Sequence, residues 1–398
     1  MAEFRKRLAD GNATREQKRL KVRQQFLVFQ FVTFFASKVV ILIPKWEAKQ
    51  SRKREGEERV RVRKHWVRNH ADFASFVSED DIKKVTSQDE AESDLSQCLL
   101  PFFDIQEKVS KKAKLDGERY FIAESSETIR ILIQESTQKS PNDYGLNSIR
   151  LKSIFLKPSS LFDEPVRLLN DIEEAIRIRR EREDQTIDHP GFKVLVGSES
   201  VLSEVAGFPI ARGALACGIV PTDRDETWLH SFLQYKITQK SDPVRILALD
   251  GICDNTNLGS MIRCASAFGV NVVVVSQNTC DCWYRRTIRV SMGHIFRIPI
   301  VRVSNLASAI TKWSSPELNM TSYAAVLETD YLLSDIKHGD LPKSWCCIMG
   351  NEGNGISSAV REAATHKLRI QIEPGVDSLS VPVATGILLN GLREREAR

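Results

Sequence analysis

The most restrictive feature of this chain is a repeated pattern in its C-terminal part, where short apolar runs end in glycine-bearing turns. Residues 244–249 form an apolar run that leads into a turn-rich loop at 250–259. Residues 260–268 have helical character up to Gly269, and a second apolar run follows at 271–275. Strand, loop, helix and strand in this order predict a βαβ unit. Such folds bind ligands at the carboxyl ends of their parallel strands.

Two further stretches repeat this arrangement. The apolar run 345–349 ends in the turn Gly350-Asn-Glu-Gly-Asn-Gly355, and a strand from Leu368 leads through a Pro-Gly loop into a helix rich in small residues. The glycine spacing of the turn matches neither a dinucleotide-binding fingerprint nor a Walker loop. Taken alone, the turn is a weak signal and favours an ordinary tight βα turn.

Together the three stretches resemble the SpoU/TrmH family of RNA ribose 2′-O-methyltransferases, within the SPOUT superfamily. The first contains the family pattern N-x-G-x-x-x-R as Asn257 to Arg263. The second contains M-G-x-E-G-x-G as Met349 to Gly355, and the third is similar to S-L-N-V-S-V-A at Ser378 to Ala384. Each motif is modest, but their order and spacing make the combination specific.

The resemblance implies an α/β fold in which a C-terminal SPOUT domain with a trefoil knot follows a smaller α/β substrate-binding domain. It also implies S-adenosylmethionine as cofactor, held largely by backbone groups of Gly350, Ile370 and Leu379. An adenine in an apolar slot needs backbone donors and acceptors, and glycine lets the backbone approach closely.

The resemblance further assigns catalytic roles to four residues: Asn257, Arg263, Glu352 and Ser380. Arg263 would activate the ribose hydroxyl, but a guanidinium is effectively always charged, so an electrostatic role is chemically more reasonable. Asn257 and Glu352 would hold the arginine and the loops. Ser380 stands where the family has Asn, which puts the role of the third motif in doubt.

RNA is the partner that the resemblance implies, rRNA more than tRNA because a positioning domain precedes the catalytic one. Three arginines, Arg285, Arg286 and Arg289, are candidates for binding RNA phosphates, together with Arg297 and Arg302 nearby. A homodimer is expected. Two alternatives stay open: a non-catalytic RNA-binding or ribosome-assembly protein that kept the fold, and a generic nucleotide-binding enzyme that would bind ATP or NAD.

Composition and patterning suggest the domain organisation. The length of 398 residues allows two to three domains. We expect a basic and apolar extension over 1–114, largely irregular or helical. The family resemblance implies a ribosomal-protein-like α/β domain for RNA binding over 115–240 and the methyltransferase domain over 244–398. Apolar runs that alternate with helical patterns indicate the α/β character of the middle segment.

The front of the chain is strongly basic, with 19 Lys and Arg against 7 Asp and Glu in residues 1–70, whereas the remainder has 38 against 45. A uniformly polybasic nucleic-acid binder is therefore excluded. The apolar run 26–44 is near the length of a membrane span, but a central Lys38 costs about 2.5–3.5 kcal/mol on insertion. A membrane span is therefore disfavoured without being excluded. Acidic residues near the start weaken the interpretation of this segment as an organelle transit peptide. A poorly ordered extension remains the alternative.

Cysteine usage points to an intracellular compartment, cytoplasmic or organellar, because the spacing of the eight cysteines suits reduced thiols better than bridges. The pairs Cys280/Cys282 and Cys346/Cys347 lack C-x-x-C spacing, so no metal site is expected.

Overall fold

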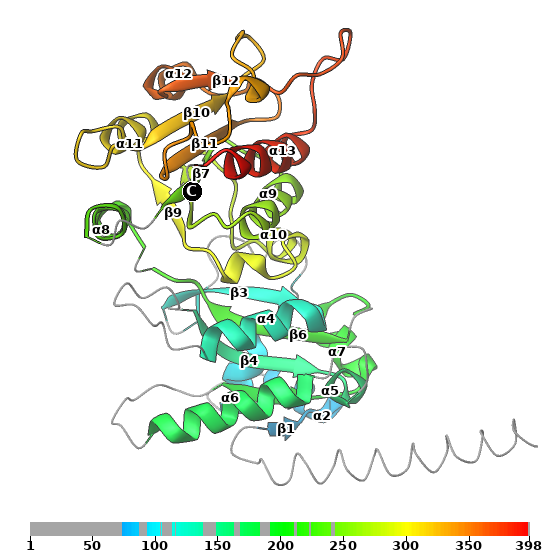
Figure 1. Ribbon diagram of the computed structural model, residues 1–398. Helices are drawn as coiled ribbons and strands as arrows, with labels where there is room; N and C mark the ends of the chain where they lie inside the picture. Colours follow the sequence, from blue (N-terminus) through cyan, green and yellow to red (C-terminus); the bar gives the residue numbers. More distant parts are fainter. Residues whose placement is uncertain are drawn as a thin grey trace, which may run out of the picture. The chain divides into compact units, whose positions relative to one another are not determined.

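Two six-stranded sheets organise the described part of the chain (Figure 1). The computed structural model describes residues 74–86, 94–103, 105, 114–115, 117–137, 149–162, 168–183, 192–210, 213–222, 224–239 and 243–396. Both sheets belong to one compact unit. No helix among these residues is long and apolar enough to span a bilayer. The apolar run 26–44 lies outside the described residues.

The C-terminal sheet is entirely parallel, with the strand order β12-β10-β11-β7-β8-β9. Its central strands read as continuous apolar runs because helices cover both faces of the sheet. The strands are β7 (Arg245–Asp250), β8 (Val272–Ser276), β9 (Ile300–Val303), β10 (Thr321–Ala325), β11 (Trp345–Gly350) and β12 (His366–Leu368).

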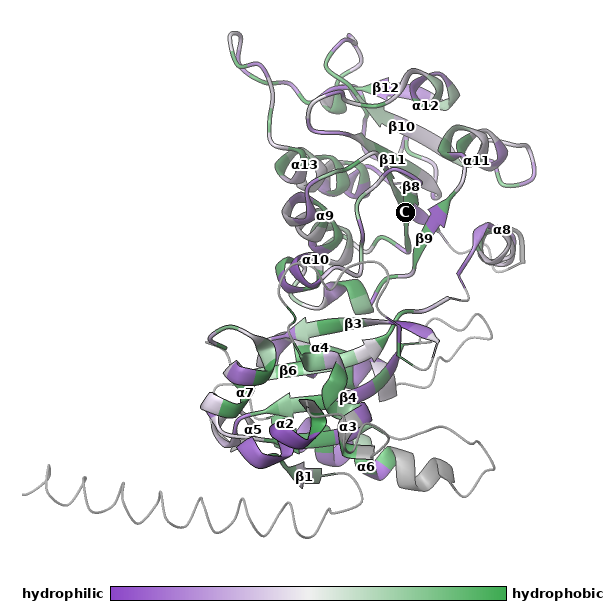
Figure 2. Ribbon diagram, turned by 180° about the vertical axis from the view of Figure 1, so that it is seen from behind, coloured by the Kyte–Doolittle hydropathy of each residue, from purple (hydrophilic) through white to green (hydrophobic). Residues whose placement is uncertain are grey.

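Helices lie on both sides of this sheet (Figure 1). One side carries α9 (Asn255–Ala267), α10 (Arg285–Val290) and α13 (Val381–Glu394), and the other carries α8 (Glu226–Gln234), α11 (Leu306–Trp313) and α12 (Ser358–Ala363). Hydrophobic residues concentrate on strands such as β8 (Figure 2). The short helices are η2 (Tyr235–Gln239), η3 (His294–Phe296) and η4 (Leu333–Asp335).

Helix α9 begins five residues earlier than the sequence pattern predicts, at Asn255 instead of Ser260. The reason is a local cap: the side chain of Asp254 accepts a hydrogen bond of 2.8 Å from the backbone N–H of Asn257. Such a cap satisfies one of the free N–H groups at a helix start. Asn257 therefore lies in the first turn of the helix and not in the loop before it.

The middle sheet is mixed, with the order β1-β5-β4-β6-β3-β2. The first three strands pair in parallel and the remaining pairs are antiparallel. Its strands are β1 (Ala74–Phe76), β2 (Lys114–Leu115), β3 (Glu118–Glu124), β4 (Arg150–Leu156), β5 (Lys193–Val196) and β6 (Ala214–Ile219). Its helices are α2 (Glu79–Thr86), α3 (Asp94–Leu99), η1 (Leu100–Phe102), α4 (Ser126–Thr137), α5 (Pro158–Phe162), α6 (Leu168–Glu183) and α7 (Glu199–Ala206).

The α/β class predicted from the sequence is confirmed, while the trefoil knot stays a prediction. The domain limits also stay predictions, although β1 lies upstream of the expected boundary at residue 115 and already pairs with β5. We call the mixed sheet with its helices the middle unit, and the parallel sheet with its helices the C-terminal unit. The hydrophobic cluster of the middle unit includes Leu99 and Phe102, which likewise precede that boundary.

Candidate functional site

The turn that follows β11 is a closed backbone loop. Asn351 and Gly355 exchange two backbone hydrogen bonds of 2.9 and 3.0 Å. The side-chain oxygen of Asn351 also accepts hydrogen bonds from the N–H groups of Gly353 (2.9 Å) and Asn354 (3.0 Å). A Cβ on Gly350 would lie 2.2 Å from backbone atoms of Gly355 and Ile356. Only glycine fits at position 350, because the loop folds back onto its own backbone.

The turn is tied to the loop after β7. The side-chain amide of Asn351 donates to the carbonyl of Gly251 at 2.8 Å. Asn257 donates from Nδ2 to Glu352 Oε1 at 3.0 Å, and the N–H of Cys253 donates to Glu352 Oε2 at 3.4 Å. The first and second motifs therefore meet, with Asn257 and Glu352 as the bridge between them.

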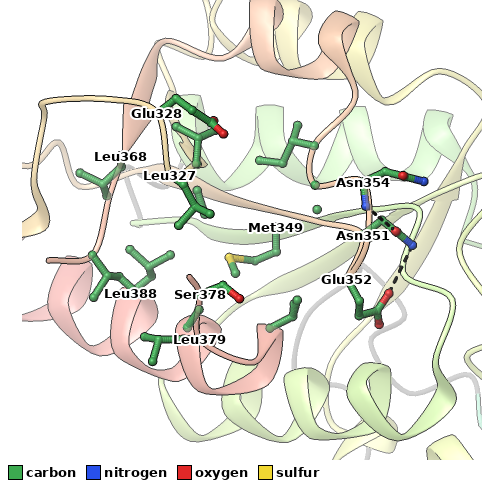
Figure 3. A pocket seen from close by; sticks show the side chains of 18 of the residues that line it. Leu327, Glu328, Met349, Asn351, Glu352, Asn354, Leu368, Ser378, Leu379 and Leu388 are labelled. Carbon is green, nitrogen blue, oxygen red and sulfur yellow. Dashed lines mark hydrogen bonds between the residues drawn. The ribbon is translucent and has the colours of Figure 1, made fainter. Parts of the chain in front are cut away.

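A cavity of about 460 Å³ lies beside this turn, and we call it the main cavity (Figure 3). The end of β11, the loop after β10, the loop after β12 and the start of α13 form its walls. All three residues predicted to contact a cofactor line it: Gly350, Ile370 and Leu379. Met349 and Leu388 supply apolar lining, and both are nearly fully buried.

Four charged groups line the main cavity, and the sequence reasoning singled out only Glu352. The additional ones are Glu328, Arg361 and Asp377. They come from the loop after β10, from α12 and from the loop before α13. Asp377 directly precedes the third motif, whereas Glu328 and Arg361 have no motif around them. Because these segments are separate in the sequence, only the fold brings the three charges together. Figure 3 shows Glu328 and Glu352 on different sides of Met349.

Ser380 is the N-cap residue of α13, between the cavity-lining residues Leu379 and Val381. Its side chain is exposed and makes no capping hydrogen bond. Pro382 follows in the first turn, where its missing N–H removes no helical hydrogen bond. Ser380 is therefore an exposed residue between two residues that line the main cavity, and it does not line the cavity itself.

Arg263 is exposed and does not line the main cavity. It lies on α9, six residues after Asn257, and six residues of helix correspond to about 9 Å. The next residue, Cys264, has its Sγ 3.9 Å from the carbonyl oxygen of Pro382, which puts this turn of α9 against the start of α13. No ion pair joins Arg263 to another residue in the described ranges. The structure thus joins Asn257 to Glu352 and leaves Arg263 apart from them.

Two neighbouring groups are influenced by the Arg263 charge. Burial raises the pKa of the Cys264 thiol, and the Arg263 guanidinium acts in the opposite direction. Burial lowers the pKa of His294, and the charges of Arg297 and Arg263 lower it further. A 2.8 Å hydrogen bond joins His294 Nδ1 to Ser266 Oγ. Burial and the two arginine charges therefore favour the neutral form of the His294 ring.

The predicted RNA-binding arginines lie on α10, which packs against the middle unit. Arg285 Nη1 is 3.7 Å and Arg289 Nη1 is 3.8 Å from Oε2 of the buried Glu124. The Arg285 guanidinium also lies 4.6 Å from the ring centroid of Phe208. Arg286 is exposed and has no ion pair with another described residue. Of the three, it is the one whose charge is most available.

The other two arginines of this region hold structure together. Arg297 donates to Glu135 Oε1 at 3.2 Å. Arg302 donates to four backbone carbonyls in the segment 276–280, at 2.7 to 3.1 Å. The sequence could not separate these roles, because their partners lie far along the chain or are backbone atoms.

The model of the SpoU rRNA Methylase family matches residues 245–390 of this chain. A curated relative, the 23S rRNA (guanosine-2′-O-)-methyltransferase RlmB of Pseudomonas syringae, is 31% identical over 174 residues, which are 44% of this chain and 68% of the relative. RlmB of Neisseria meningitidis is 30% identical over 47% of this chain and 72% of its own length. The 23S rRNA methyltransferase RlmP of Bacillus subtilis is 33% identical over 37% of this chain and 58% of its own length.

Solved structures share the fold. The AdoMet-bound rRNA methyltransferase of Sinorhizobium meliloti superposes with a TM-score of 0.53 at 21% identity, over 80% of this chain and 97% of its own. An RNA 2′-O ribose methyltransferase superposes with a TM-score of 0.51 at 18% identity, over 81% of this chain and 99% of its own. Both likenesses extend over the middle unit as well as the C-terminal one.

Proposed function

This chain belongs to the SpoU rRNA methylase family, and from that premise we propose that it transfers a methyl group from S-adenosylmethionine to a ribose 2′-hydroxyl of rRNA. The observation that carries the proposal is the closed turn at Gly350, which borders the main cavity and is fastened to the first motif through Asn257 and Glu352. Curated relatives that act on rRNA support the choice of substrate.

The main cavity suits S-adenosylmethionine in size and chemistry. Its volume of about 460 Å³ falls within the range of about 300–1,000 Å³ that is usual for small-molecule sites. Apolar walls around Met349 and Leu388 suit an adenine, and the turn at Gly350 presents backbone groups. The carboxylates of Glu328 and Asp377 suit a ligand that carries a sulfonium and an ammonium, while Arg361 suits its carboxylate.

When bound, S-adenosylmethionine supplies a methyl group that is already activated, so the protein contributes mainly by positioning. Asn257 and Glu352 fix the turn against α9 and hold the wall of the main cavity. Arg263 presents a permanent positive charge, which orients an RNA phosphate and stabilises the alkoxide character of the attacking 2′-oxygen. Ser380 offers an exposed hydroxyl between two residues that line the main cavity.

RNA would approach along α10, where Arg286 is exposed and Arg285 and Arg289 stand beside it. Phosphate contacts of this kind position the RNA without reading its sequence. The middle unit, which contacts α10 through β3, would extend the binding surface.

We further propose that the chain acts as a homodimer through α13. Val383 and Ile387 on this helix are 52% and 39% exposed, and Val376 in the preceding loop is 50% exposed. Arg263 lies on the neighbouring helix, outside the main cavity. A second copy that covers α13 would bury these apolar side chains and bring a second α9 to the site.

The dimer is tested with Val383→Glu and Ile387→Glu, measured by sedimentation and by methyl transfer. We expect a monomer with little activity. Leu100→Glu is the matched control, because Leu100 is an equally exposed apolar residue in the middle unit. An active monomer would contradict the proposal.

The activity is tested with labelled S-adenosylmethionine and unmodified rRNA, alongside calorimetry with S-adenosylhomocysteine. We expect incorporation at ribose 2′-oxygens by the wild type. Arg263→Ala should lower incorporation by about 100-fold, the scale for losing one electrostatic contact in a transition state, and should leave cofactor affinity unchanged. Cofactor binding without incorporation into any RNA would contradict the proposed function.

A further inference from the structure

A second cavity, of about 430 Å³, lies at the carboxyl ends of β7, β8 and β9. It is lined by Asp250, Ser276, Gln277, Asn278, Ser304, Asn305, Leu306, Ala307, Ser357, Ala359 and Val360. None of these residues lines the main cavity.

The two cavities flank neighbouring strands. Gly350, which lines the main cavity, is the register partner of Asp250, which lines the second cavity. Adjacent strands are about 4.8 Å apart. The strand end that lines the second cavity therefore lies next to the strand end that lines the main cavity.

The loop that borders the second cavity is rigidly braced. Arg302 donates to the carbonyls of Ser276, Gln277, Thr279 and Cys280. Ser276 Oγ accepts from the N–H of Gly251 at 2.8 Å and donates to the side-chain oxygen of Asn278 at 2.6 Å. Because Ser276 donates to the side-chain oxygen of Asn278, the side-chain amide of Asn278 is held in one orientation.

Several side chains of the second cavity keep hydrogen-bond donors or acceptors that a ligand could use. Asn305 uses its side-chain oxygen to cap α11, by accepting from the N–H of Ser308 at 2.9 Å. Asn278 and Asn305 both retain an NH₂ group with no hydrogen bond to another described residue. Asp250 is 7% exposed, and its Oδ2 accepts from the N–H of Ser357 at 2.8 Å. Its Oδ1 retains acceptor capacity, as does the hydroxyl of the N-cap residue Ser357.

The lining excludes a phosphate and suits a planar heterocycle. Among the described residues, no Lys, Arg or His lines the second cavity, and the buried Asp250 carboxylate disfavours an anion. Leu306, Ala307 and Val360 supply an apolar surface for the face of a ring. Amide donors with a carboxylate acceptor are the groups that proteins use to read base edges.

We propose that the second cavity binds a nucleobase of the RNA substrate, with Asp250 accepting from the base and Asn278 and Asn305 donating to it. Guanine fits best, because its Watson–Crick edge presents two adjacent N–H donors beside the O6 acceptor. This inference rests on the proposed function, since it assumes an RNA substrate. It adds a base-reading site to the methyl-transfer site.

The test measures affinities of the full-length protein for three labelled RNA hexamers: UUGUUU, the same hexamer with inosine for guanosine, and UUUUUU. We expect the wild type to prefer the guanosine hexamer over the uridine hexamer by about tenfold, the scale for one good base contact. Inosine lacks the N2 amino group, so its hexamer should bind with intermediate affinity.

Three variants sharpen the test. Asn305→Ser keeps a helix cap while it removes the NH₂ group, and Asn278→Ala removes the second amide. Asp250→Asn preserves an acceptor for Ser357 and presents a donor to the cavity. Each should abolish the guanosine preference without weakening the uridine hexamer, and S-adenosylhomocysteine affinity should stay constant. Gln234→Ala is the matched control, because Gln234 is a half-buried amide on α8 that does not line the second cavity.

Equal wild-type affinity for all three hexamers would overturn the inference, as would variants that weaken all three equally. Guanosine preference without methyl incorporation would contradict only the proposed function. Incorporation without any base preference would contradict only this inference.

Discussion

The two sheets of this protein use their charged and polar residues differently. In the C-terminal unit, polar residues stand at the carboxyl ends of buried strands: Asp250 is the last residue of β7 and Asn351 follows β11. Both border cavities. In the middle unit, some charged residues of β3 and α4 face the C-terminal unit: Arg119 pairs with Asp281 at 2.9 Å. Glu124 and Glu135 face arginines in the same way. One sheet therefore builds sites, and the other uses its charges for docking.

The docking contact has an apolar centre. Phe121 on β3 stacks on Trp283 and on Phe296 of the C-terminal unit, each at 5.3 Å between ring centroids. Gly218 on β6 leaves room for this ring, since a Cβ there would lie 2.3 Å from it. Ion pairs surround an aromatic core, an arrangement that is typical of stable interfaces.

The largest effect is expected from Gly350→Ala, which alters the turn that borders the main cavity in the C-terminal unit. The new Cβ would meet backbone atoms of Gly355 and Ile356 at 2.2 Å, so the turn must open. We expect no measurable S-adenosylhomocysteine binding by calorimetry. Gly353→Ala is the matched control in the same turn, because its Cβ would meet only Asn351 Oδ1, at 3.5 Å. Wild-type affinity in Gly350→Ala would show that the turn does not form the cofactor wall.

A smaller effect is expected from Phe121→Ala, which removes the aromatic centre of the contact between the two units. Phe121 is 2% exposed, and truncation of a buried Phe costs about 3–5 kcal/mol. Urea unfolding should show this loss, while cofactor affinity of the folded protein stays unchanged. Phe76→Ala, at a position that is 47% exposed, should change the free energy of unfolding by less than about 0.5 kcal/mol. Loss of cofactor affinity in Phe121→Ala would mean that docking and site are coupled.

The sequence predicted the C-terminal unit better than the middle unit, for a physical reason. Glycine turns and buried parallel strands leave local patterns, so the segments around Asn257 and Gly350 could be placed at one sheet edge. The hydrogen bond from Asn351 to Gly251 joins residues 100 positions apart and leaves no pattern. The ion pair between Arg285 and Glu124 likewise leaves no pattern in the sequence. In the middle unit, alternating strands and helices suggested an α/β layer, and only the structure shows β6 antiparallel to β3 and β4.

A third effect, smaller again, is expected where the two units share charges. Glu124→Gln removes the carboxylate that faces Arg285 and Arg289. If α10 contacts RNA phosphates, RNA should bind more tightly, and the slope of log K against log salt should steepen by about 0.7–0.9 for each arginine released. Glu127→Gln is the control, since its carboxylate pairs with Arg130 on the same helix. Unchanged RNA affinity in Glu124→Gln would show that Arg285 and Arg289 do not contact RNA.

The smallest effect is a pair of opposite pH dependences, one from each region. Burial raises the pKa of Glu135 on α4 above 4.5, although Arg297 opposes the shift. Hydrogen bonds from the backbone N–H and the hydroxyl of Ser304 lower the pKa of Glu226, on α8 of the C-terminal unit, below 4.5.

A raised native pKa means that the folded state binds the proton more tightly than the unfolded state does. The contribution of Glu135 to stability is therefore largest below pH 4.5 and is lost as pH rises through its native pKa. Glu226 behaves in the opposite way: its contribution is present above pH 4.5 and is lost as pH falls through its native pKa. Urea unfolding of wild type, Glu135→Gln and Glu226→Gln across this range measures both. The stability difference between wild type and variant should grow on acidification for Glu135 and shrink for Glu226. Slopes of the same sign would contradict the assignment of one carboxylate to a buried docking contact and the other to a hydrogen-bonded surface position.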